Sequence, residues 1–381
     1  MTHEPQIEYA GADCLEQLPA VLERYGARDV FLVVGTNSYN ASGAEAALTP
    51  MLASHPVTTF AEFRKNTQFA DVETGVERFR ESGGDVVIAV GGGSVIDMAK
   101  LINGLAAQPH DKREYILGKR HLEQPIKPLI VIPTTAGSGS EATHFAVVYM
   151  DDKKYSLAHD MLLPNVVLLD SQLSMSMPLH VTASTGMDAL CQAIESYWSV
   201  HACSESRAYA AEAIPLVLDH LEKAVRDPDA EARFAMARAA NLAGKAINIT
   251  KTTACHAMSY ALTSHWNVPH GHAVALTLGE MYVYISEVND KDVLDPRGVD
   301  HVRQTITELN ALLGCPSADQ ARNRIDELMK AIGLETRLSE LGIAAADDID
   351  DIVESVNPER LRNNPRQLSE PSARAILERI R

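Results

Sequence analysis

The stretch from residue 85 to residue 100 reads DVVIAVGGGSVIDMAK, and it decides the fold of the first half of the chain. Residues 85–90 form a short, β-branched apolar run, which is typical of a buried parallel strand. Three glycines and Ser94 follow immediately and open a helix. Glycines let the backbone approach a phosphate closely, and a helix start offers free N–H groups with the positive end of the helix dipole. The stretch therefore predicts a strand, a phosphate-binding turn and a helix; the alternative interpretation is a tight turn that binds nothing.

The same alternation continues on both sides of this stretch. Further buried strands are predicted at 29–34 and 129–132, and an amphipathic helix is predicted at 71–82. A further pair of strands is predicted at 145–150 and 166–169. Strands that alternate with helices predict an open, mostly parallel sheet with helices on both faces, which is a common frame for binding a dinucleotide.

After Pro178 the pattern changes to long, alanine-rich helices, and strand-like runs nearly vanish. The expected helices span 183–199, 205–225, 231–247, 253–265, 304–313 and 318–332. A chain of 381 residues also exceeds the usual limit of a single core. We therefore expect an α/β nucleotide-binding domain at 1–179 and an all-helical domain at 180–381, packed around a shared cleft.

The composition excludes several classes of partner. A net charge of −17 argues against nucleic acid and against anionic membrane surfaces. The five cysteines are odd in number and contain no Cys-x-x-Cys pair, which indicates free thiols in a reducing compartment. No apolar run reaches the roughly 18 residues that a membrane span needs, and the N-terminus carries no basic-then-apolar signal. We therefore expect a cytoplasmic protein that acts on a small molecule.

A second small-residue loop follows the strand predicted at 129–132. It reads PTTAGSGSE from Pro133 to Glu141 and is rich in hydroxyl groups. Because the carboxyl ends of parallel strands lie at one edge of a sheet, we expect this loop to border the same crevice as the glycine turn. The alternative is a flexible connector, which the preceding buried strand disfavours.

Three residues of the second half form an incomplete metal-binding pattern. Asp188 lies in GMDALCQAIE, His256 in CHAM and His270 in PHGH. Each alone is more often a helix cap or a satisfied core group, but three ligands from separate segments can hold a divalent cation and leave a position open for substrate. A fourth ligand is expected one helical turn after the aspartate, where this chain has Gln192.

Together, the two loops, the Asp188 segment and the spacing of His256 and His270 resemble the iron-containing (group III) alcohol dehydrogenases along essentially the whole chain. The resemblance implies a nucleotide-binding α/β domain, a helical domain and a divalent metal, Fe²⁺ or Zn²⁺, in the cleft between them. In that family the metal polarises a carbonyl group while a nicotinamide cofactor delivers hydride. We also expect a homodimer.

The resemblance assigns the binding residues position by position. The cofactor residues are Gly91, Gly92, Gly93 and Ser94 at the pyrophosphate, Asp97 and Lys154 near the nicotinamide and its ribose, and Thr134, Thr135 and Ser138 in the second loop. Asp188, His256 and His270 match three of the four metal ligands, and Gln192 replaces the fourth, a histidine. Three interpretations stay open: glutamine is the fourth ligand, three ligands and water hold the metal, or the metal is lost.

Two further departures from the family concern the substrate. Tyr260 replaces a histidine one turn after His256, and it is either a hydroxyl donor near the nascent alkoxide or a core aromatic. The run Lys251-Thr252-Thr253 places a lysine and two hydroxyls at the start of the helix that carries His256, and such a helix start favours an anion. The alternative is N-capping by one threonine beside a solvated lysine.

These residues predict a small aldehyde that carries an acidic group. Lys251, Thr252 and Thr253 are predicted to bind the acid, with Gln192 beside it. The predicted catalytic residues are Lys251, Tyr260 and His270. Within the family, this combination resembles the members that reduce phosphonoacetaldehyde to 2-hydroxyethylphosphonate. The alternatives are a general short-chain alcohol or lactaldehyde dehydrogenase, a lyase or synthase on the related dehydroquinate synthase scaffold, and a catalytically inactive nucleotide-binding homologue.

The loop after the strand at 29–34 bears on the choice of cofactor. It reads Gly35-Thr36-Asn37-Ser38, and Thr36 stands where the family's NAD-preferring members carry an aspartate. An aspartate would repel a 2′-phosphate, whereas Thr36, Asn37 and Ser38 can donate hydrogen bonds to it. NADPH is therefore predicted, and NADH remains the alternative because the loop contains no arginine.

Overall fold

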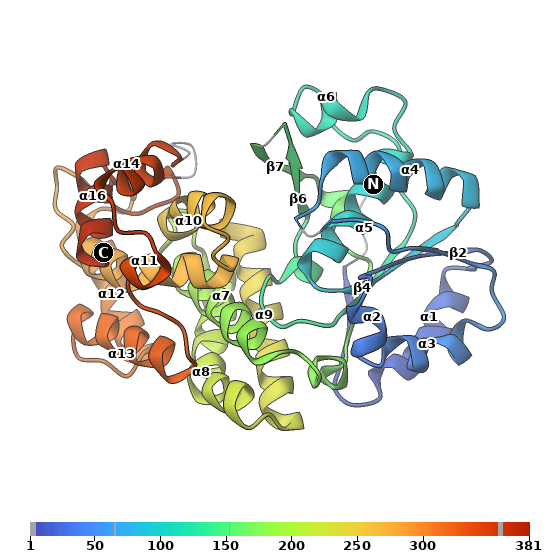
Figure 1. Cartoon of the computed structure of the whole chain (residues 1–381), viewed down its shortest axis with the longest axis horizontal. Coiled ribbons are helices and arrows are strands. Elements are labelled where there is room, and N and C mark those ends of the chain that lie inside the picture. Colours follow the sequence, from blue (N-terminus) through green and yellow to red (C-terminus); the bar gives the residue numbers. More distant parts are fainter. Residues whose placement is uncertain (1–4, 65, 152, 357–360) are drawn as a thin grey trace. The chain divides into compact units, whose positions relative to one another are not determined.

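The computed structural model describes residues 5–64, 66–151, 153–356 and 361–381. The chain divides into two compact units, Met1–Met177 and Pro178–Arg381, and the boundary predicted from the sequence lies two residues further along. The first unit is α/β and the second is built of helices in the described ranges (Figure 1). The predicted fold class, an α/β domain followed by a helical domain, is confirmed.

A six-stranded sheet forms the centre of the first unit, in the order β1-β8-β5-β4-β2-β3 with every neighbouring pair parallel. Its strands are β1 (Ile7–Ala10), β2 (Val30–Val34), β3 (Val57–Phe60), β4 (Val86–Gly91), β5 (Leu129–Pro133) and β8 (Val166–Leu169). The helices of this unit are α1 (Leu18–Arg24), α2 (Ser38–Ala41), α3 (Ala44–Leu52), α4 (Phe69–Ser82), α5 (Gly93–Ala106) and α6 (Lys112–Ile116).

Burial on both faces explains why the central strands are apolar throughout. All five residues of β2 and all six of β4 are buried. Along β2, Phe31 and Val33 pack into the core that contains residues of α4 and α5, whereas Leu32 and Val34 pack into the core that contains residues of α1 and α3. Successive side chains of a strand point to opposite faces, so helices on both sides require an unbroken apolar run.

The predicted pairing of the strands at 145–150 and 166–169 is wrong, although both strands exist. The first is β6 (Phe145–Met150), which pairs antiparallel with β7 (Lys153–Ala158) in a separate two-stranded sheet. The second, β8, lies between β1 and β5 in the main sheet. Their burial gives the physical reason, because every residue of β8 is buried while β6 alternates between buried and half-buried residues. A strand buried on both faces belongs inside the large sheet.

The second unit is organised around one long helix, α7 (Leu179–Trp198). The other helices described in it are α8 (Ser204–Arg226), α9 (Ala230–Thr250), α10 (Ala254–His265), α11 (His270–Ser286), α12 (Val299–Leu312), α13 (Ala318–Ala331), α14 (Ala346–Glu354) and α16 (Glu370–Arg379). From Gly186 to Trp198 every residue of α7 is buried, and α7 packs against α8, α9 and α11. A helix buried on all sides carries apolar and small residues around its whole circumference, which explains its alanine-rich sequence.

Within the described ranges, no helix combines the length and the apolar character that a membrane crossing requires.

Candidate active site

The glycine turn and the second small-residue loop lie side by side at the carboxyl end of the sheet. Strands β4 and β5 are neighbours, and Gly91 at the end of β4 is in register with Pro133 at the end of β5. The backbone N–H of Thr134 donates to the carbonyl of Gly91 at 3.0 Å. The prediction that the two loops border each other is therefore met in the structure.

The glycines are required by the close approach of the second loop. A Cβ on Gly92 would lie 3.0 Å from Oγ1 of Thr135, and a Cβ on Gly93 would lie 2.6 Å from Oγ of Ser138. The contact at Gly93 is closer than real Cβ atoms approach and the one at Gly92 is at the limit, so the hydroxyl side chains of the second loop lie directly against the glycine turn at the start of α5. Such a turn at a helix start is suited to a phosphate.

The hydroxyl of Thr134 supplies a second observation at this place. Its Oγ1 atom is buried and has no hydrogen-bond partner among the described residues. Buried polar atoms are nearly always satisfied, and one that is not often awaits a ligand. The glycine turn and this hydroxyl together fit a bound dinucleotide.

Asp97, which was predicted to lie near the nicotinamide, is tied to the second loop and to β6. Its carboxylate accepts hydrogen bonds from Oγ of Ser140 at 2.5 Å and from the backbone N–H of Val147 at 3.0 Å. Burial raises the pKa of Asp97, and the positive charges of Lys100 and Lys154 act in the opposite direction. The predicted cofactor residues Asp97 and Lys154 therefore lie within electrostatic reach of each other.

Lys100 is a residue of this region whose role the sequence did not reveal. It is fully buried on α5, and its Nζ donates to the carbonyls of Ser140 and Thr143 at 2.6 Å each and to that of Phe145 at 3.0 Å. Burial lowers the pKa of Lys100 to about 8. These hydrogen bonds hold the end of the second loop against α5. In the sequence, this role is indicated only by a lysine that interrupts an apolar helical pattern.

The loop predicted to select the cofactor is exposed at Thr36, Asn37 and Ser38. The hydroxyl of Thr36 donates to the carbonyl of Ala61, just after β3, at 2.8 Å. In this arrangement Thr36 offers a ligand an acceptor rather than a donor. Contacts to a 2′-phosphate would therefore fall to Asn37 and Ser38.

The three residues of the metal pattern meet in the second unit. Asp188 comes from α7, His256 from α10 and His270 from α11, and one ligand atom from each lies within 4.8 Å of the others. Nε2 of His256 is 3.3 Å from Oδ1 of Asp188, and the two imidazole rings are 5.5 Å apart. Asp188 and His256 are each only 5% exposed. One carboxylate and two imidazoles are a donor set that suits Fe²⁺ or Zn²⁺.

Local packing explains the residues on either side of His270. Pro269 precedes the first residue of α11, which is His270 itself. A Cβ on Gly271 would lie 1.9 Å from the carbonyl oxygen of Ser184 and 2.8 Å from Cβ of Asp188. Only glycine lets α11 approach α7 closely enough to bring His270 to the aspartate.

Gln192 occupies the position of the missing fourth ligand, one turn after Asp188 on α7. It is 3% exposed, and its side chain hydrogen-bonds to Asp188. Its Oε1 atom is buried and accepts no hydrogen bond in the described structure. Burial alone would raise the pKa of Asp188, but His256, His270 and Gln192 outweigh burial and hold it below its ordinary value. Gln192 is thus part of the cluster.

A fifth residue of the cluster, Glu195, went unnoticed in the sequence. It lies on α7, its side chain is fully buried, and its carboxylate contacts Nδ1 of His256. Burial alone would lower the pKa of His256, but Glu195 and Asp188 outweigh it and raise that pKa to about 9. A glutamate at helical spacing from Asp188 was its only signal, because its partners lie about sixty residues further along the chain.

The run from Lys251 to Thr253 is divided between surface and core. Lys251 is exposed, Thr252 is half-buried and Thr253 is fully buried. The hydroxyl of Thr253 donates to Glu195 at 2.7 Å and accepts from the indole N–H of Trp198 at 2.9 Å. Both hydrogen-bonding roles of this hydroxyl are therefore taken inside the protein.

The interpretation that the start of α10 binds an external anion needs correction. The backbone N–H groups of Cys255 and His256 point to Oε1 of Glu195, at 2.8 and 3.4 Å. A carboxylate from α7 already supplies the negative charge that this helix start favours. Of the three residues predicted to bind an acid, only Lys251 and Thr252 are accessible at the surface. Tyr260 is half-buried on α10, and both interpretations of it remain open.

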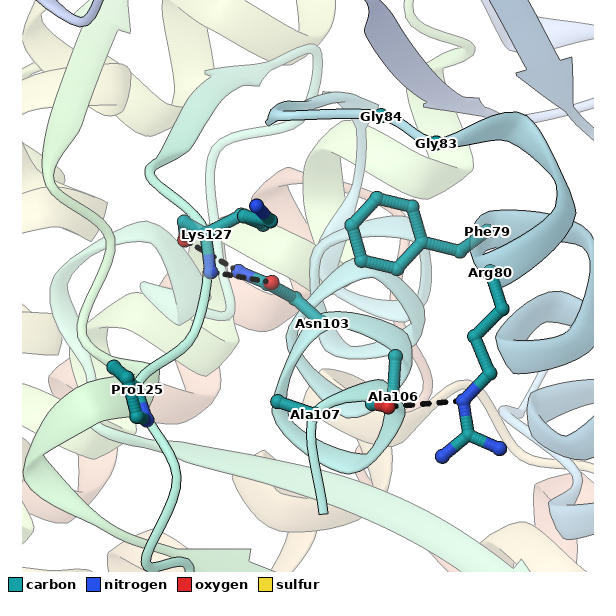
Figure 2. A pocket seen from close by; sticks show the side chains of 9 residues that line it. All are labelled: Phe79, Arg80, Gly83, Gly84, Asn103, Ala106, Ala107, Pro125 and Lys127. Atoms are coloured by element: carbon teal, nitrogen blue, oxygen red, sulfur yellow. Dashed lines mark hydrogen bonds between the residues drawn. The ribbon is translucent and has the colours of Figure 1, made fainter. Parts of the chain in front are cut away.

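A separate cavity of about 250 Å³ lies elsewhere in the first unit. Its lining residues are Phe79, Arg80, Gly83, Gly84, Asn103, Ala106, Ala107, Pro125 and Lys127 (Figure 2). Asn103 and Ala106 lie at the last turn of α5, whereas the glycine turn lies at its first. About 15–20 Å of helix separates the two ends, so this cavity is not part of the candidate active site.

Comparison with known proteins places the chain in a family. The family model described as "Iron-containing alcohol dehydrogenase" matches residues 5–171, and the model of the C-terminal part of the Fe-containing alcohol dehydrogenase family matches residues 182–381. The chain therefore belongs to the iron-containing alcohol dehydrogenase family, as the motifs predicted, and it is an oxidoreductase.

Individual members of the family show which substrates similar proteins are named for. A phosphonoacetaldehyde reductase of Streptomyces viridochromogenes is 36% identical over 77% of this chain and 75% of the relative. A long-chain-alcohol dehydrogenase of Geobacillus thermodenitrificans is 31% identical over 98% of this chain and 95% of the relative. Among solved structures, sulfoacetaldehyde reductase from Bifidobacterium kashiwanohense in complex with NAD⁺ superposes with a TM-score of 0.88 at 29% identity, covering 99% of this chain and 97% of that one. Two of these three relatives are named as aldehyde reductases, in agreement with the predicted aldehyde reductase activity.

Proposed function

We propose that this enzyme reduces a small aldehyde carrying an acidic group, with NADPH and a divalent metal, and that the substrate is phosphonoacetaldehyde. The product is then 2-hydroxyethylphosphonate. Two relatives found by independent comparisons, one by sequence and one by structure, are reductases named for two-carbon aldehydes with an acidic group. The cluster of buried Asp188, buried His256 and half-buried His270 is the observation that carries the reaction type.

The cluster fits a divalent cation by its donor chemistry and its burial. Asp188, His256 and His270 would hold Fe²⁺ or Zn²⁺, with the amide oxygen of Gln192 as the fourth donor. When bound there, such a cation supplies Lewis-acid polarisation of the aldehyde oxygen. An amide oxygen is a neutral and weaker donor than imidazole, so we expect weaker retention of metal than in a site with a third histidine.

The protein's own groups position the substrate and move the proton. The ammonium of Lys251 attracts the acidic group, and the hydroxyl of Thr252 adds a hydrogen bond. In this proposal Tyr260, one helical turn beyond His256, donates the proton that the product alcohol needs. The helix start at Thr253 excludes a second anion because Glu195 occupies it.

The glycine turn and the second loop bind the cofactor in this proposal. Gly91, Gly92, Gly93 and Ser94 hold the pyrophosphate, Thr134, Thr135 and Ser138 line its neighbouring surface, and Asp97 and Lys154 bind toward the nicotinamide end. When bound there, NADPH would supply the hydride. The absence of an acidic residue at 35–38 supports NADPH over NADH, because nothing in this loop repels a 2′-phosphate. We also propose that the enzyme is a cytoplasmic homodimer. Sedimentation velocity tests the oligomeric state.

Steady-state kinetics test the substrate class through Lys251. We expect Lys251→Ala to lower kcat/KM for phosphonoacetaldehyde about 10- to 100-fold, which corresponds to about 1.5–3 kcal/mol for a hydrogen bond to a charged group. The same variant should leave kcat/KM for propionaldehyde within about twofold. Lys330→Ala, an exposed lysine on α13, is the matched control and should affect neither substrate. Equal losses on both aldehydes in Lys251→Ala would contradict an acid-binding role.

A second candidate is a dehydrogenase of neutral alcohols. The observation in its favour is the long-chain-alcohol dehydrogenase that matches 98% of this chain. The two candidates differ in selectivity, because a neutral alcohol gains nothing from a cation at position 251. A wild-type kcat/KM for a neutral aldehyde above that for phosphonoacetaldehyde would favour this second candidate.

A further inference from the structure

One carboxylate, that of Glu195, joins the start of α10 to the metal cluster. Its Oε1 accepts from the hydroxyl of Thr253 at 2.7 Å and from the backbone N–H groups of Cys255 at 2.8 Å and His256 at 3.4 Å. The N-cap residue of α10 is Thr253, and its own side chain makes no capping bond. Glu195 therefore caps this helix from the neighbouring helix α7.

The other oxygen of the same carboxylate contacts the ring of a proposed metal ligand. Oε2 of Glu195 hydrogen-bonds to Nδ1 of His256, while Nε2 of the ring faces Asp188 at 3.3 Å. The glutamate side chain is fully buried and that of His256 is 6% exposed, so water does not compete for this bond. An imidazole that donates from Nδ1 presents the lone pair of Nε2 to a cation.

We propose that Glu195 is a positioning residue of the metal centre, which fixes both the tautomer and the ring orientation of His256. This inference rests on the metal site proposed above. A carboxylate behind a ligating histidine fixes the ring and makes it a stronger donor. Here the same carboxylate is anchored by three donors from residues 253–256, so the ligand and the start of its own helix are held as one unit. Thr253 acts through Glu195 in this arrangement.

Glu195 could act only as a helix cap or also position His256, and the variant Glu195→Gln distinguishes these two roles. Three donors converge on Oε1, so the amide oxygen of the variant stays at the cap and its NH₂ group turns toward Nδ1 of His256. The amide then donates to Nδ1 and places the proton on Nε2, where it blocks the cation. The cap survives, because an amide oxygen also accepts hydrogen bonds, while the ligand is lost.

The experiment measures Co²⁺ binding to chelator-treated full-length protein by its visible absorption, in competition with a chelator of known affinity. We expect Glu195→Gln to weaken Co²⁺ affinity 10- to 100-fold, with little change in the melting temperature of the metal-free protein. Glu280→Gln is the matched control, because Glu280 is a buried glutamate of the same unit that pairs with Arg322 and Arg379 instead of a histidine. This control should bind Co²⁺ like the wild type.

Each outcome supports or overturns the positioning role of Glu195. Unchanged Co²⁺ affinity in Glu195→Gln, with normal binding by the wild type, overturns the positioning role and leaves the metal site intact. A loss of affinity only in proportion to a fall in melting temperature assigns Glu195 a structural role and also overturns it. No Co²⁺ binding by the wild type overturns both this inference and the proposed metal site. ¹⁵N shifts of His256 in the Zn²⁺-loaded wild type should show a protonated Nδ1; a protonated Nε2 would contradict the proposal.

Discussion

Gly271→Ala is the substitution that most sharply tests the packing of the candidate site. The added Cβ would lie 1.9 Å from the carbonyl oxygen of Ser184, and real Cβ atoms essentially never approach closer than 3.0 Å. The start of α11 must therefore move away from α7 by about 1 Å, because a backbone carbonyl cannot rotate aside. Overpacking of this kind costs about 1–3 kcal/mol, and the helix propensity gained from alanine returns at most about 1 kcal/mol.

The net result expected for Gly271→Ala is a destabilisation of about 1–2 kcal/mol. For a unit of this size that corresponds to a fall in Tm of about 2–8 °C. Metal binding should weaken at the same time, because the displaced segment carries His270 and the new Cβ also meets Asp188 at 2.8 Å. Differential scanning calorimetry of the metal-free protein gives the first quantity, and Co²⁺ titration gives the second.

Gly279→Ala is the matched control on the same helix. A Cβ there would meet Cγ of Arg322 at 2.8 Å, while Cα of Arg322 at 3.5 Å is in ordinary contact, so rotation of the arginine side chain relieves the clash without moving backbone. This variant should keep wild-type Co²⁺ affinity and lie within about 1 kcal/mol of wild-type stability. A Gly271→Ala protein as stable as Gly279→Ala, with unchanged Co²⁺ affinity, would refute the close approach of α11 to α7.

Substitutions at Thr36, Lys251 and Lys100 test the cofactor loop, a strained backbone position and a buried charge. Thr36→Asp should shift the ratio of kcat/KM for NADPH over NADH toward NADH by about tenfold or more, because a carboxylate repels the 2′-phosphate; an unchanged ratio would contradict the role of this loop. Lys251 has φ 59° and ψ 178°, a region that is essentially glycine's, so Lys251→Gly should raise the free energy of unfolding by about 1 kcal/mol relative to Lys251→Ala, and equal urea midpoints would contradict it. Burial lowers the pKa of Lys100 to about 8 from an ordinary 10.5. Between pH 8 and pH 10.5 the unfolded chain therefore binds more protons than the folded protein, and the free energy of unfolding should rise with pH. Urea unfolding at pH 7.5 and 9.5 should show this rise in the wild type and not in Lys100→Met.

The central part of the fold was predictable because its signals are local. Strands β2, β4 and β5 are unbroken β-branched runs, and the glycine turn follows one of them directly. Strands β1, β3 and β7 were missed because polar residues interrupt them, as in the VTTF of β3. The pairing of β6 and β8 depends on which faces the rest of the molecule covers, and a short apolar run does not contain that information.

Some residues of the candidate site could be predicted from the sequence and others could not. Asp188, His256 and His270 could be found because each stands in a recognisable segment. Glu195 could not, because its function depends on three donors from another helix. Thr253 was misjudged for the same reason, since a threonine before a helix looks like a cap or an anion ligand until its partner is known. Residues that act through a neighbour carry little signal of their own.

Metal content and activity, measured together, test the central claim most directly. Protein purified without oxygen is analysed for Fe and Zn, then assayed with phosphonoacetaldehyde and NADPH before chelation, after chelation and after return of Fe²⁺ or Zn²⁺. We predict that chelation abolishes reduction, that one of the two ions restores it, and that His270→Ala abolishes the restoration. Full activity in chelated protein that contains no divalent metal would contradict metal-assisted reduction at Asp188, His256 and His270.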